Sequence, residues 1–362
     1  MSASRTKRIP FQPLAQPTVM GEGERHLRNL SLPAQAIEFF ATNWGIERLH
    51  PPQYDAMKPL FEQNNILLAI PTASGKSLVA YIAILNQLLT VNPGSRAVYI
   101  VPLKALASEK FDELKTLGQH LGLKVGLGIG DATAEAKNID DSDILICTSE
   151  KLDSLMRTRS ELMSNVSIVV ADEFHLLHDG SRGPTLEINL TRLRTLRPNA
   201  QLIALSATVG NCEALAEWLN ASLVQSDWRP VDLEYATLHD RHLEPRKIQS
   251  SSVDSSTQAL SPPRHLEGPL SHPTWIVVQD TIEHGGQVLI FVGTRRSAQS
   301  EAKKLSERVK KRFAKDEPER LLELDKLAES LEGRTQTSMG ELLAQCLRGG
   351  VAFHHAGLTH RQ

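Results

Sequence analysis

Residues 65–89 read NILLAIPTASGKSLVAYIAILNQLL, and this stretch decides the fold of the first half of the chain. A short apolar run from Ile66 to Ile70 predicts a strand, and apolar residues that recur at helical spacing after Ser77 predict a helix. A loop of small residues that ends in Gly-Lys-Ser joins the two. A strand, such a loop and a helix together form the phosphate-loop arrangement. Loop N–H groups and the helix N-terminus then face a phosphate chain.

In this interpretation the Lys76 ammonium reaches the outer phosphates and the Ser77 hydroxyl coordinates Mg²⁺. The usual pattern has a glycine at the position of Ile70, so only the Gly75-Lys76-Ser77 end is strictly kept. The alternative is a Gly-Lys turn at the start of an ordinary helix. An isolated GKS does not decide between the two.

Composition sets wide bounds. The chain has 362 residues, which is enough for two or three domains. Its 41% hydrophobic and 23% charged residues are typical of a globular protein. The 40 basic and 42 acidic residues nearly balance, so a nucleic-acid partner needs a local basic surface.

Two further features bear on the compartment. The three cysteines form no metal-spaced set, which predicts buried free thiols and a reducing environment; they are Cys147, Cys212 and Cys346. No apolar run reaches about 18 residues, so no transmembrane helix is expected. The N-terminus lacks the apolar core of a signal peptide, and a cytoplasmic protein is the expectation.

The chain divides into segments of different character. Residues 1–25 are rich in Pro and Gly and are predicted to form a flexible tail. From Ile66 to about Asp227, apolar strands alternate with helical segments, which predicts a parallel sheet covered on both faces. The strands are expected at 66–70, 97–101, 125–129, 144–147, 168–171 and 202–205.

The second part of the chain is less regular. Residues 240–273 are rich in Ser and Pro and are predicted to be a long surface loop or a disordered insert. A second α/β pattern follows it. Its elements are expected at 275–283 (helix), 288–292 (strand), 297–331 (charged helical region) and 350–353 (strand). A lobe with only two or three strands has a small core, and therefore this second lobe is expected to be incomplete.

A second motif, VVADEFH from Val169 to His175, carries acidic residues that could act together with the loop. An apolar strand that ends in Asp172-Glu173 places two carboxylates at the carboxyl edge of a sheet, where ligands of open α/β folds bind. Asp172 can hold Mg²⁺ through water, and Glu173 can polarise the water that attacks the γ-phosphate. Alone, the pair could be an acidic helix cap. Because the pair follows a phosphate loop by several β/α units, the catalytic interpretation is strongly favoured.

In this order and spacing, PTASGKS, ADEFH and Ser206-Ala207-Thr208 resemble the motifs of superfamily-two DExH helicases. Other segments resemble the Ski-two-like branch, particularly its archaeal ATP-dependent DNA repair helicases. These are HPPQ from His50, VPLKALA from Val101, TSEKLD from Thr148, RGPTLE from Arg182, SDWRP from Ser226 and FHHAGL from Phe353. The resemblance implies a RecA-like lobe 1 at 26–230, a linker with the insert at 231–273, and a truncated RecA-like lobe 2 at 274–362.

The resemblance also implies roles for matching residues, with Lys76, Asp172 and Glu173 as the catalytic set and ATP and Mg²⁺ as cofactors. Gln53 would read the adenine edge; without the family it is only a polar residue at a helix start. The nucleotide loop would comprise Ile70, Pro71, Thr72, Ala73, Ser74, Gly75, Lys76 and Ser77, with Ser77 and Asp172 on the metal. Coupling of hydrolysis to strand movement would fall to His175, Ser206, Ala207 and Thr208. Backbone contacts to a single strand would come from Lys104, Thr148, Arg182, Thr294 and Arg295.

The expected function is therefore that of an ATP-dependent 3′-to-5′ DNA helicase acting on single-stranded or forked DNA in the repair of stalled forks, associated with the nucleoid. In this family the arginines that reach the γ-phosphate follow FHHAGL, beyond the end of this sequence, and an arginine finger contributes roughly 10³–10⁵ in rate. The chain alone is therefore expected to bind nucleotide and to hydrolyse it weakly.

Three alternatives stay open. The chain could be a non-hydrolysing nucleotide- or DNA-binding module, or one half of a split helicase with a second chain. It could also belong to an RNA helicase of the same branch, because no residue recognisably reads a 2′-hydroxyl.

Overall fold

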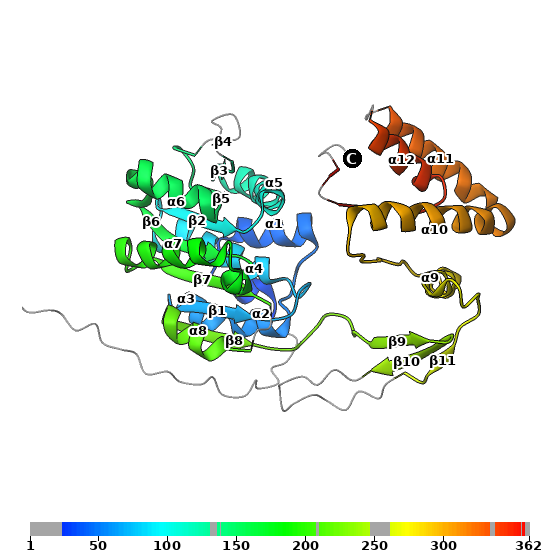
Figure 1. Ribbon diagram of the computed structural model, residues 1–362. Coiled ribbons are helices and arrows are strands. Elements are labelled where there is room, and N and C mark those ends of the chain that lie inside the picture. The colour runs from blue at the N-terminus through cyan, green and yellow to red at the C-terminus, as the bar shows by residue number, and fades with distance from the viewer. Residues whose placement is uncertain are drawn as a thin grey trace, which may run out of the picture. The chain divides into compact units, whose positions relative to one another are not determined.

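The computed structural model describes residues 24–130, 136–137, 139–207, 210–246, 261–333, 337–355 and 357–358. The chain forms two compact units, with the boundary between Leu233 and Glu234 (Figure 1). This boundary falls inside the stretch 231–273 that was predicted as a linker.

The first unit is built on an eight-stranded sheet with the order β4-β3-β5-β2-β6-β7-β1-β8. Seven strands run parallel, and β4 pairs antiparallel with β3 at one edge. The strands are β1 (Asn65–Ala69), β2 (Arg96–Val101), β3 (Val125–Gly128), β4 (Ala136–Lys137), β5 (Ile144–Thr148), β6 (Val166–Ala171), β7 (Gln201–Ser206) and β8 (Ala221–Gln225). This is the RecA-like fold that was expected.

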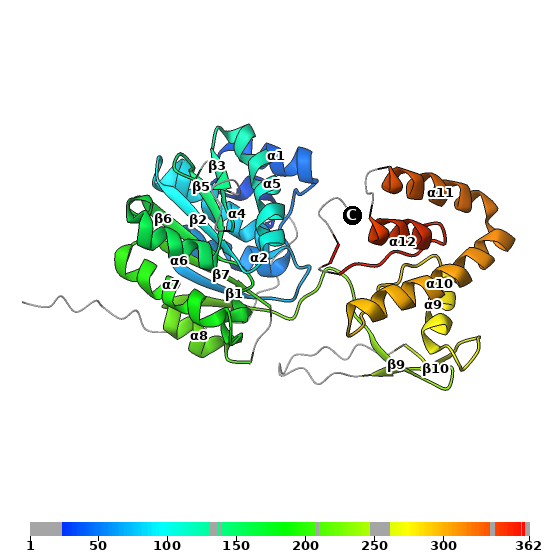
Figure 2. The ribbon, with the colours of Figure 1, turned by 45° about the horizontal axis from the view of Figure 1, so that its top comes forward.

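Helices cover both faces of this sheet (Figures 1 and 2). Alternate residues of each strand enter two separate apolar cores, as the two-residue period of a strand requires. Ile66, Tyr99 and Val170 lie in the core shared with α1, α3, α4 and α5, whereas Leu67 and Val169 lie in the core shared with α6, α7 and α8. The helices are α1 (Ala34–Trp44), α2 (Pro51–Asp55), α3 (Met57–Phe61), α4 (Lys76–Asn86), α5 (Lys104–Leu121), α6 (Ser149–Thr158), α7 (Gly183–Leu196) and α8 (Cys212–Leu219).

All six strands predicted in this unit are present, with ends that differ by two residues at most. The structure adds β8, which pairs with β1 at the edge of the sheet. Its residues ASLVQ are mostly half-exposed, and so they lack the continuous apolar run that marks the central strands. Pairing with Asn65–Ala69 defines this strand, and such long-range pairing leaves no local signature.

In its described residues, the second unit contains a three-stranded antiparallel sheet and four helices. The sheet comprises β9 (Tyr235–His239), β10 (His242–Arg246) and β11 (Arg264–His265). The prediction of a loop across 240–273 is therefore wrong for the ends of that stretch; residues 247–260 lie outside the described residues. The helices are α9 (Pro273–Glu283), α10 (Arg295–Asp316), α11 (Pro318–Glu332) and α12 (Ser338–Leu347).

The strands predicted at 288–292 and 350–353 are also wrong, because neither segment is paired as a strand in the structure. A strand needs a hydrogen-bonding neighbour, and no described segment pairs with either. As a result, Leu289 is 80% exposed and Phe291 is 87% exposed. The assignment of this unit as the start of a second RecA-like lobe stays a prediction.

Two simpler expectations can be checked. All three cysteines are free and buried, as predicted, and burial raises the pKa of the Cys147 thiol to about 12. None of the helices in the described ranges is long and apolar enough to cross a bilayer.

Candidate nucleotide site

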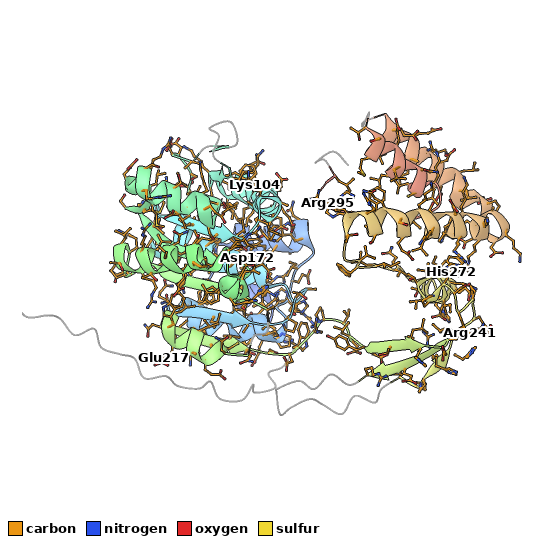
Figure 3. All side chains as sticks on the ribbon, viewed as in Figure 1. Lys104, Asp172, Glu217, Arg241, His272 and Arg295 are labelled. Carbon is orange, nitrogen blue, oxygen red and sulfur yellow. The ribbon has the colours of Figure 1, made fainter. Side chains whose placement is uncertain are left out.

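The candidate site lies at the carboxyl edge of the parallel sheet. There β1, β7 and β6 are consecutive neighbours, and their ends lead into the loop 71–75, Ala207 and Asp172 respectively. The main-chain ladder continues into the site, since Ile70 N–H donates to Ser206 O at 3.2 Å and Asp172 N–H donates to Ile100 O at 2.9 Å. Figure 3 labels Asp172 within the first unit. Two sequence-distant motifs are thus brought to one edge.

The loop has an unusual backbone. Ala73 and Gly75 have φ values of 62° and 73°, in the left-handed region, and Gly75 directly precedes the first residue of α4. The left-handed φ of Gly75 favours glycine, and a Cβ there would lie 2.3 Å from Gln53 Nε2, which would have to move. The turn leaves the N-terminus of α4 open toward the loop, which suits an anion.

Gln53 holds this loop from α2. Its Nε2 donates to Ser74 O at 3.2 Å and to Gly75 O at 2.9 Å, and its Oε1 accepts from His50 N–H at 2.7 Å. Only 2% of Gln53 is exposed. All of its amide donors are therefore used on the loop, so the adenine contact expected for Gln53 stays a prediction that needs this amide to turn.

Residues near the end of the first unit also contact the nucleotide loop. The buried Ser74 hydroxyl donates to Trp228 O at 3.4 Å, and the Trp228 ring packs against His50 with centroids 4.6 Å apart. The segment SDWRP, which contains Trp228, resembled a family motif but had no assigned role. The structure places Trp228 in contact with Ser74 of the nucleotide loop and with His50.

Lys76 is buried and folded onto the loop. Its Nζ donates to Ile70 O at 3.1 Å and Pro71 O at 3.2 Å. Burial lowers the pKa of Lys76, while the nearby carboxylates of Glu173 and Asp172 raise it. The ammonium therefore interacts electrostatically with the acidic pair, and its catalytic role stays a prediction.

Asp172 and Ser77 both lie close to one buried hydroxyl. Tyr99 Oη donates to Asp172 Oδ2 at 2.9 Å, and the nearby Ser77 hydroxyl lowers the pKa of Tyr99, which burial raises. The other carboxylate oxygen, Asp172 Oδ1, accepts from Glu173 N–H at 2.9 Å. Burial raises the pKa of Asp172, and these hydrogen bonds lower it.

The coupling residues lie beside the acidic pair. Glu173 has a left-handed backbone with φ 49°, and its Oε2 lies 3.2 Å from His175 Nδ1. The same ring nitrogen lies 3.5 Å from Ala207 N, which joins the end of β6 to the end of β7. The Ser206 hydroxyl is buried without a hydrogen-bond partner in the described structure. Thr208 lies outside the described residues.

Three of the predicted strand-binding residues lie along the same edge of the sheet. Lys104 is the exposed first residue of α5, after β2, and Arg182 is exposed before α7 (Figure 3 labels Lys104). Thr148 ends β5, but it is only 6% exposed and its hydroxyl accepts from Lys151 N–H at 3.4 Å as a cap of α6. In the second unit, Thr294 caps α10 through Ser297 N–H, and Arg295 is its exposed first residue.

The residues of the edge fit a magnesium-bound triphosphate. A hydroxyl and a carboxylate are hard oxygen donors, and Ser77 and Asp172 both lie close to the Tyr99 hydroxyl. No cluster of three or more His, Cys, Asp or Glu in the described ranges could hold a metal by itself. Mg²⁺ at phosphate sites needs only one or two protein ligands, because phosphate and water supply the rest.

A buried parallel sheet with a phosphate-type loop, a lysine and an acidic pair at its carboxyl edge defines a nucleotide-binding lobe. The family model for DEAD/DEAH box helicases matches residues 50–215, so this part of the chain is a DEAD/DEAH box helicase domain. This match confirms the predicted resemblance to DExH helicases, and the finer assignment to the Ski-two-like branch stays a prediction.

The chain is also similar in sequence to individual DNA helicases. The chain is 41% identical over 343 residues to the ATP-dependent DNA helicase Hel308 of Methanocella arvoryzae, covering 93% of this chain and 44% of that protein. It is 45% identical over 319 residues to the Hel308 of Thermococcus kodakarensis, covering 88% of this chain and 26% of that protein. The chain therefore spans less than half the length of these relatives.

Solved structures with a similar fold include the helicase MrfA bound to DNA, with a TM-score of 0.48 and 25% identity over 54% of this chain and 30% of that one. Another is the Mycobacterium smegmatis helicase Lhr bound to ssDNA and AMP-PNP, with a TM-score of 0.46 and 31% identity over 55% of this chain and 28% of that one.

Sequence reasoning missed Tyr99 as part of the site. Its signal was present as the single hydroxyl-bearing residue in the run Ala97–Val101, AVYIV. A buried tyrosine hydroxyl normally finds a partner. Without the sheet order, the partner could not be named.

Proposed function

We propose that this chain is the nucleotide-binding part of an ATP-dependent DNA helicase that moves 3′ to 5′ along single-stranded or forked DNA. The observation that carries the proposal is the carboxyl edge of the first sheet. One end of this edge, at β1, β7 and β6, gathers the nucleotide residues. The adjoining ends of β2 and β5 and the loop after β6 hold Lys104, Thr148 and Arg182.

The chain's own residues have separable tasks in this proposal. Loop N–H groups and the α4 N-terminus bind the phosphates, and the Lys76 ammonium leaves its two loop carbonyls to meet the outer phosphate. Ser77 and Asp172 hold Mg²⁺, which when bound neutralises charge that develops on the transferred phosphoryl group. Glu173 orients the attacking water and accepts its proton.

His175 connects Glu173, the residue proposed to act in hydrolysis, to the end of β7. It contacts both Glu173 Oε2, at 3.2 Å, and Ala207 N, at 3.5 Å. A change in the position of Glu173 on phosphate release is therefore transmitted to the end of β7. In this scheme Ser206, Ala207 and Thr208 pass that movement to the strand-binding residues.

Nucleotide binding is the first test, made by titrating a fluorescent ATP analogue into the 362-residue chain with Mg²⁺. Lys76→Ala should weaken binding at least tenfold, since it removes the buried ammonium that contacts the loop carbonyls. Lys124→Ala is the matched control, because Lys124 precedes β3 at the opposite, amino edge and is 66% exposed in an ion pair with Asp141. Equal affinity of Lys76→Ala and the unaltered chain would contradict the proposal.

Hydrolysis is the second test. Glu173→Gln should bind the analogue normally and lower ATP hydrolysis by about 10²–10⁴-fold, the usual contribution of a general base. The assay is made with and without single-stranded DNA, on the chain and on the longest natural protein that contains it. Unchanged turnover of Glu173→Gln would remove this residue from the reaction.

The choice of DNA rests on the relatives, which are named as DNA helicases. Competition between single-stranded DNA and RNA of one sequence tests it, and tighter RNA binding would favour an RNA helicase of the same branch. We also propose a cytoplasmic, nucleoid-associated location and a role in the repair of stalled forks, as the resemblance to DNA repair helicases implies.

A further inference from the structure

Tyr99 is a buried polar residue with no assigned role. It occupies the middle of β2, and its whole side chain is enclosed in the core between the sheet and α4. A phenylalanine would fill this space as well, so packing alone does not explain the hydroxyl. That hydroxyl lies between the two side chains proposed to hold Mg²⁺.

The sheet register places these groups together. Tyr99 pairs with Val170 of β6, and Asp172 lies two residues further along the same strand direction. Residues two apart on a strand face the same side, and a diagonal neighbour on the next strand is within reach of an aromatic side chain. Ser77, in the first turn of α4, lies over the same face. Three separate segments therefore converge on one oxygen.

We propose that Tyr99 is a positioning residue for the metal of the nucleotide site, holding the Asp172 carboxylate turned toward the Ser77 hydroxyl. This inference rests on the proposed function, because it requires Ser77 and Asp172 to bind Mg²⁺ with the nucleotide. Tyr99 itself touches neither the nucleotide nor the reacting atoms.

The hydrogen bonds leave Asp172 able to bind a cation. Each of its oxygens accepts one bond, Oδ2 from Tyr99 at 2.9 Å and Oδ1 from Glu173 N–H at 2.9 Å. A carboxylate oxygen accepts about two bonds, so each keeps one position for a metal or its water. Both donors are neutral, so no hydrogen-bonded counter-ion offsets the charge of the carboxylate. Loss of the Tyr99 donor would leave one buried oxygen unsatisfied and the carboxylate free to rotate.

Tyr81 offers a matched control in the same core. It is 3% exposed, its ring centroid lies 6.2 Å from that of Tyr99, and the nearby Ser77 hydroxyl lowers its pKa as it does that of Tyr99. Its hydroxyl, however, donates to Glu113, which forms an ion pair with Lys110 at 3.1 Å, and not to Asp172. Tyr99→Phe and Tyr81→Phe therefore differ in the bond to Asp172.

The experiment measures how much Mg²⁺ strengthens binding of a fluorescent ATP analogue, as the ratio of the affinities in Mg²⁺ and in EDTA. In Tyr99→Phe this ratio should fall about tenfold, the effect of one hydrogen bond to a charged group. Its affinity in EDTA should stay unchanged. In Tyr81→Phe the ratio should stay within about twofold of the unaltered chain. A purely structural role for Tyr99 would lower both affinities of Tyr99→Phe together and leave the ratio alone.

Other outcomes are equally decisive. Equal ratios in Tyr99→Phe and the unaltered chain would overturn this inference while leaving the proposed function standing. A ratio of one in the unaltered chain would overturn both. If Tyr99→Phe does not fold, 3-fluorotyrosine at position 99 gives a fluorine resonance that should shift with nucleotide plus Mg²⁺ but not with nucleotide alone. A fluorine resonance that does not shift when Mg²⁺ is added would refute the role of Tyr99 as a positioning residue.

Discussion

Replacement of Gln53 by alanine should destabilise the first unit and loosen the nucleotide loop at once. The side chain connects α2 to the loop through two donated bonds, to Ser74 O at 3.2 Å and Gly75 O at 2.9 Å. It also caps α2 by accepting from His50 N–H at 2.7 Å. Because Gln53 is only 2% exposed, water cannot easily replace these partners.

The three bonds set the expected magnitude. A buried hydrogen bond contributes about 1 kcal/mol net, so the loss of three lowers the free energy of unfolding by about 3 kcal/mol. For a unit of roughly 200 residues this corresponds to a fall in Tm of about 6–12 °C. The cavity left by the side chain adds to this loss.

Thermal unfolding followed by circular dichroism measures this change, and titration with a fluorescent ATP analogue measures the loop. Gln119→Ala is the matched control, because Gln119 is an exposed residue of α5 and its truncation should shift the stability by no more than about 0.5 kcal/mol. Gln53→Glu should be at least as harmful as alanine, because it turns a carboxylate toward two carbonyl oxygens. A Tm of Gln53→Ala within 2 °C of the unaltered chain, roughly 1 kcal/mol or less, would refute the reasoning.

Three further predictions concern other parts of the chain. Gly183→Ala should displace the turn before α7, because a Cβ there would lie 2.0 Å from Leu177 O; weaker single-strand binding measured by fluorescence anisotropy checks this. The Asp179 carboxylate accepts bonds from Ser181 Oγ–H and from the N–H groups of that turn, which lower the pKa of Asp179 to about 2. Its stabilising effect should be complete above the unfolded pKa near 4 and fall as the pH drops toward 2, and a carboxyl ¹³C titration giving a normal pKa would contradict this. Phe291→Ser should reduce self-association in analytical ultracentrifugation, because Phe291 is 87% exposed in an apolar segment.

The sequence alone predicted the local elements of the first unit. Its central strands are continuous apolar runs, and the loop 71–75 is flanked by a strand period and a helix period. Such signals depend on neighbouring residues only, so they survive without knowledge of the fold. The same locality explains the errors at 288–292 and 350–353. Their composition suits a strand, but a strand also needs a neighbour.

The tertiary structure decided which distant residues share a site. The order β6-β7-β1 brings Asp172 and the nucleotide loop to one edge of the sheet, with the end of β7 between them, and no local pattern encodes that order. The register of β2 on β6 likewise sets Tyr99 diagonal to Asp172. The direction of the Gln53 amide was decided in the same way, since it depends on how α2 packs against the loop. Pairing between strands is set by burial summed over the whole sheet, so the sequence supplied the chemical groups and the packed sheet determined which of them meet.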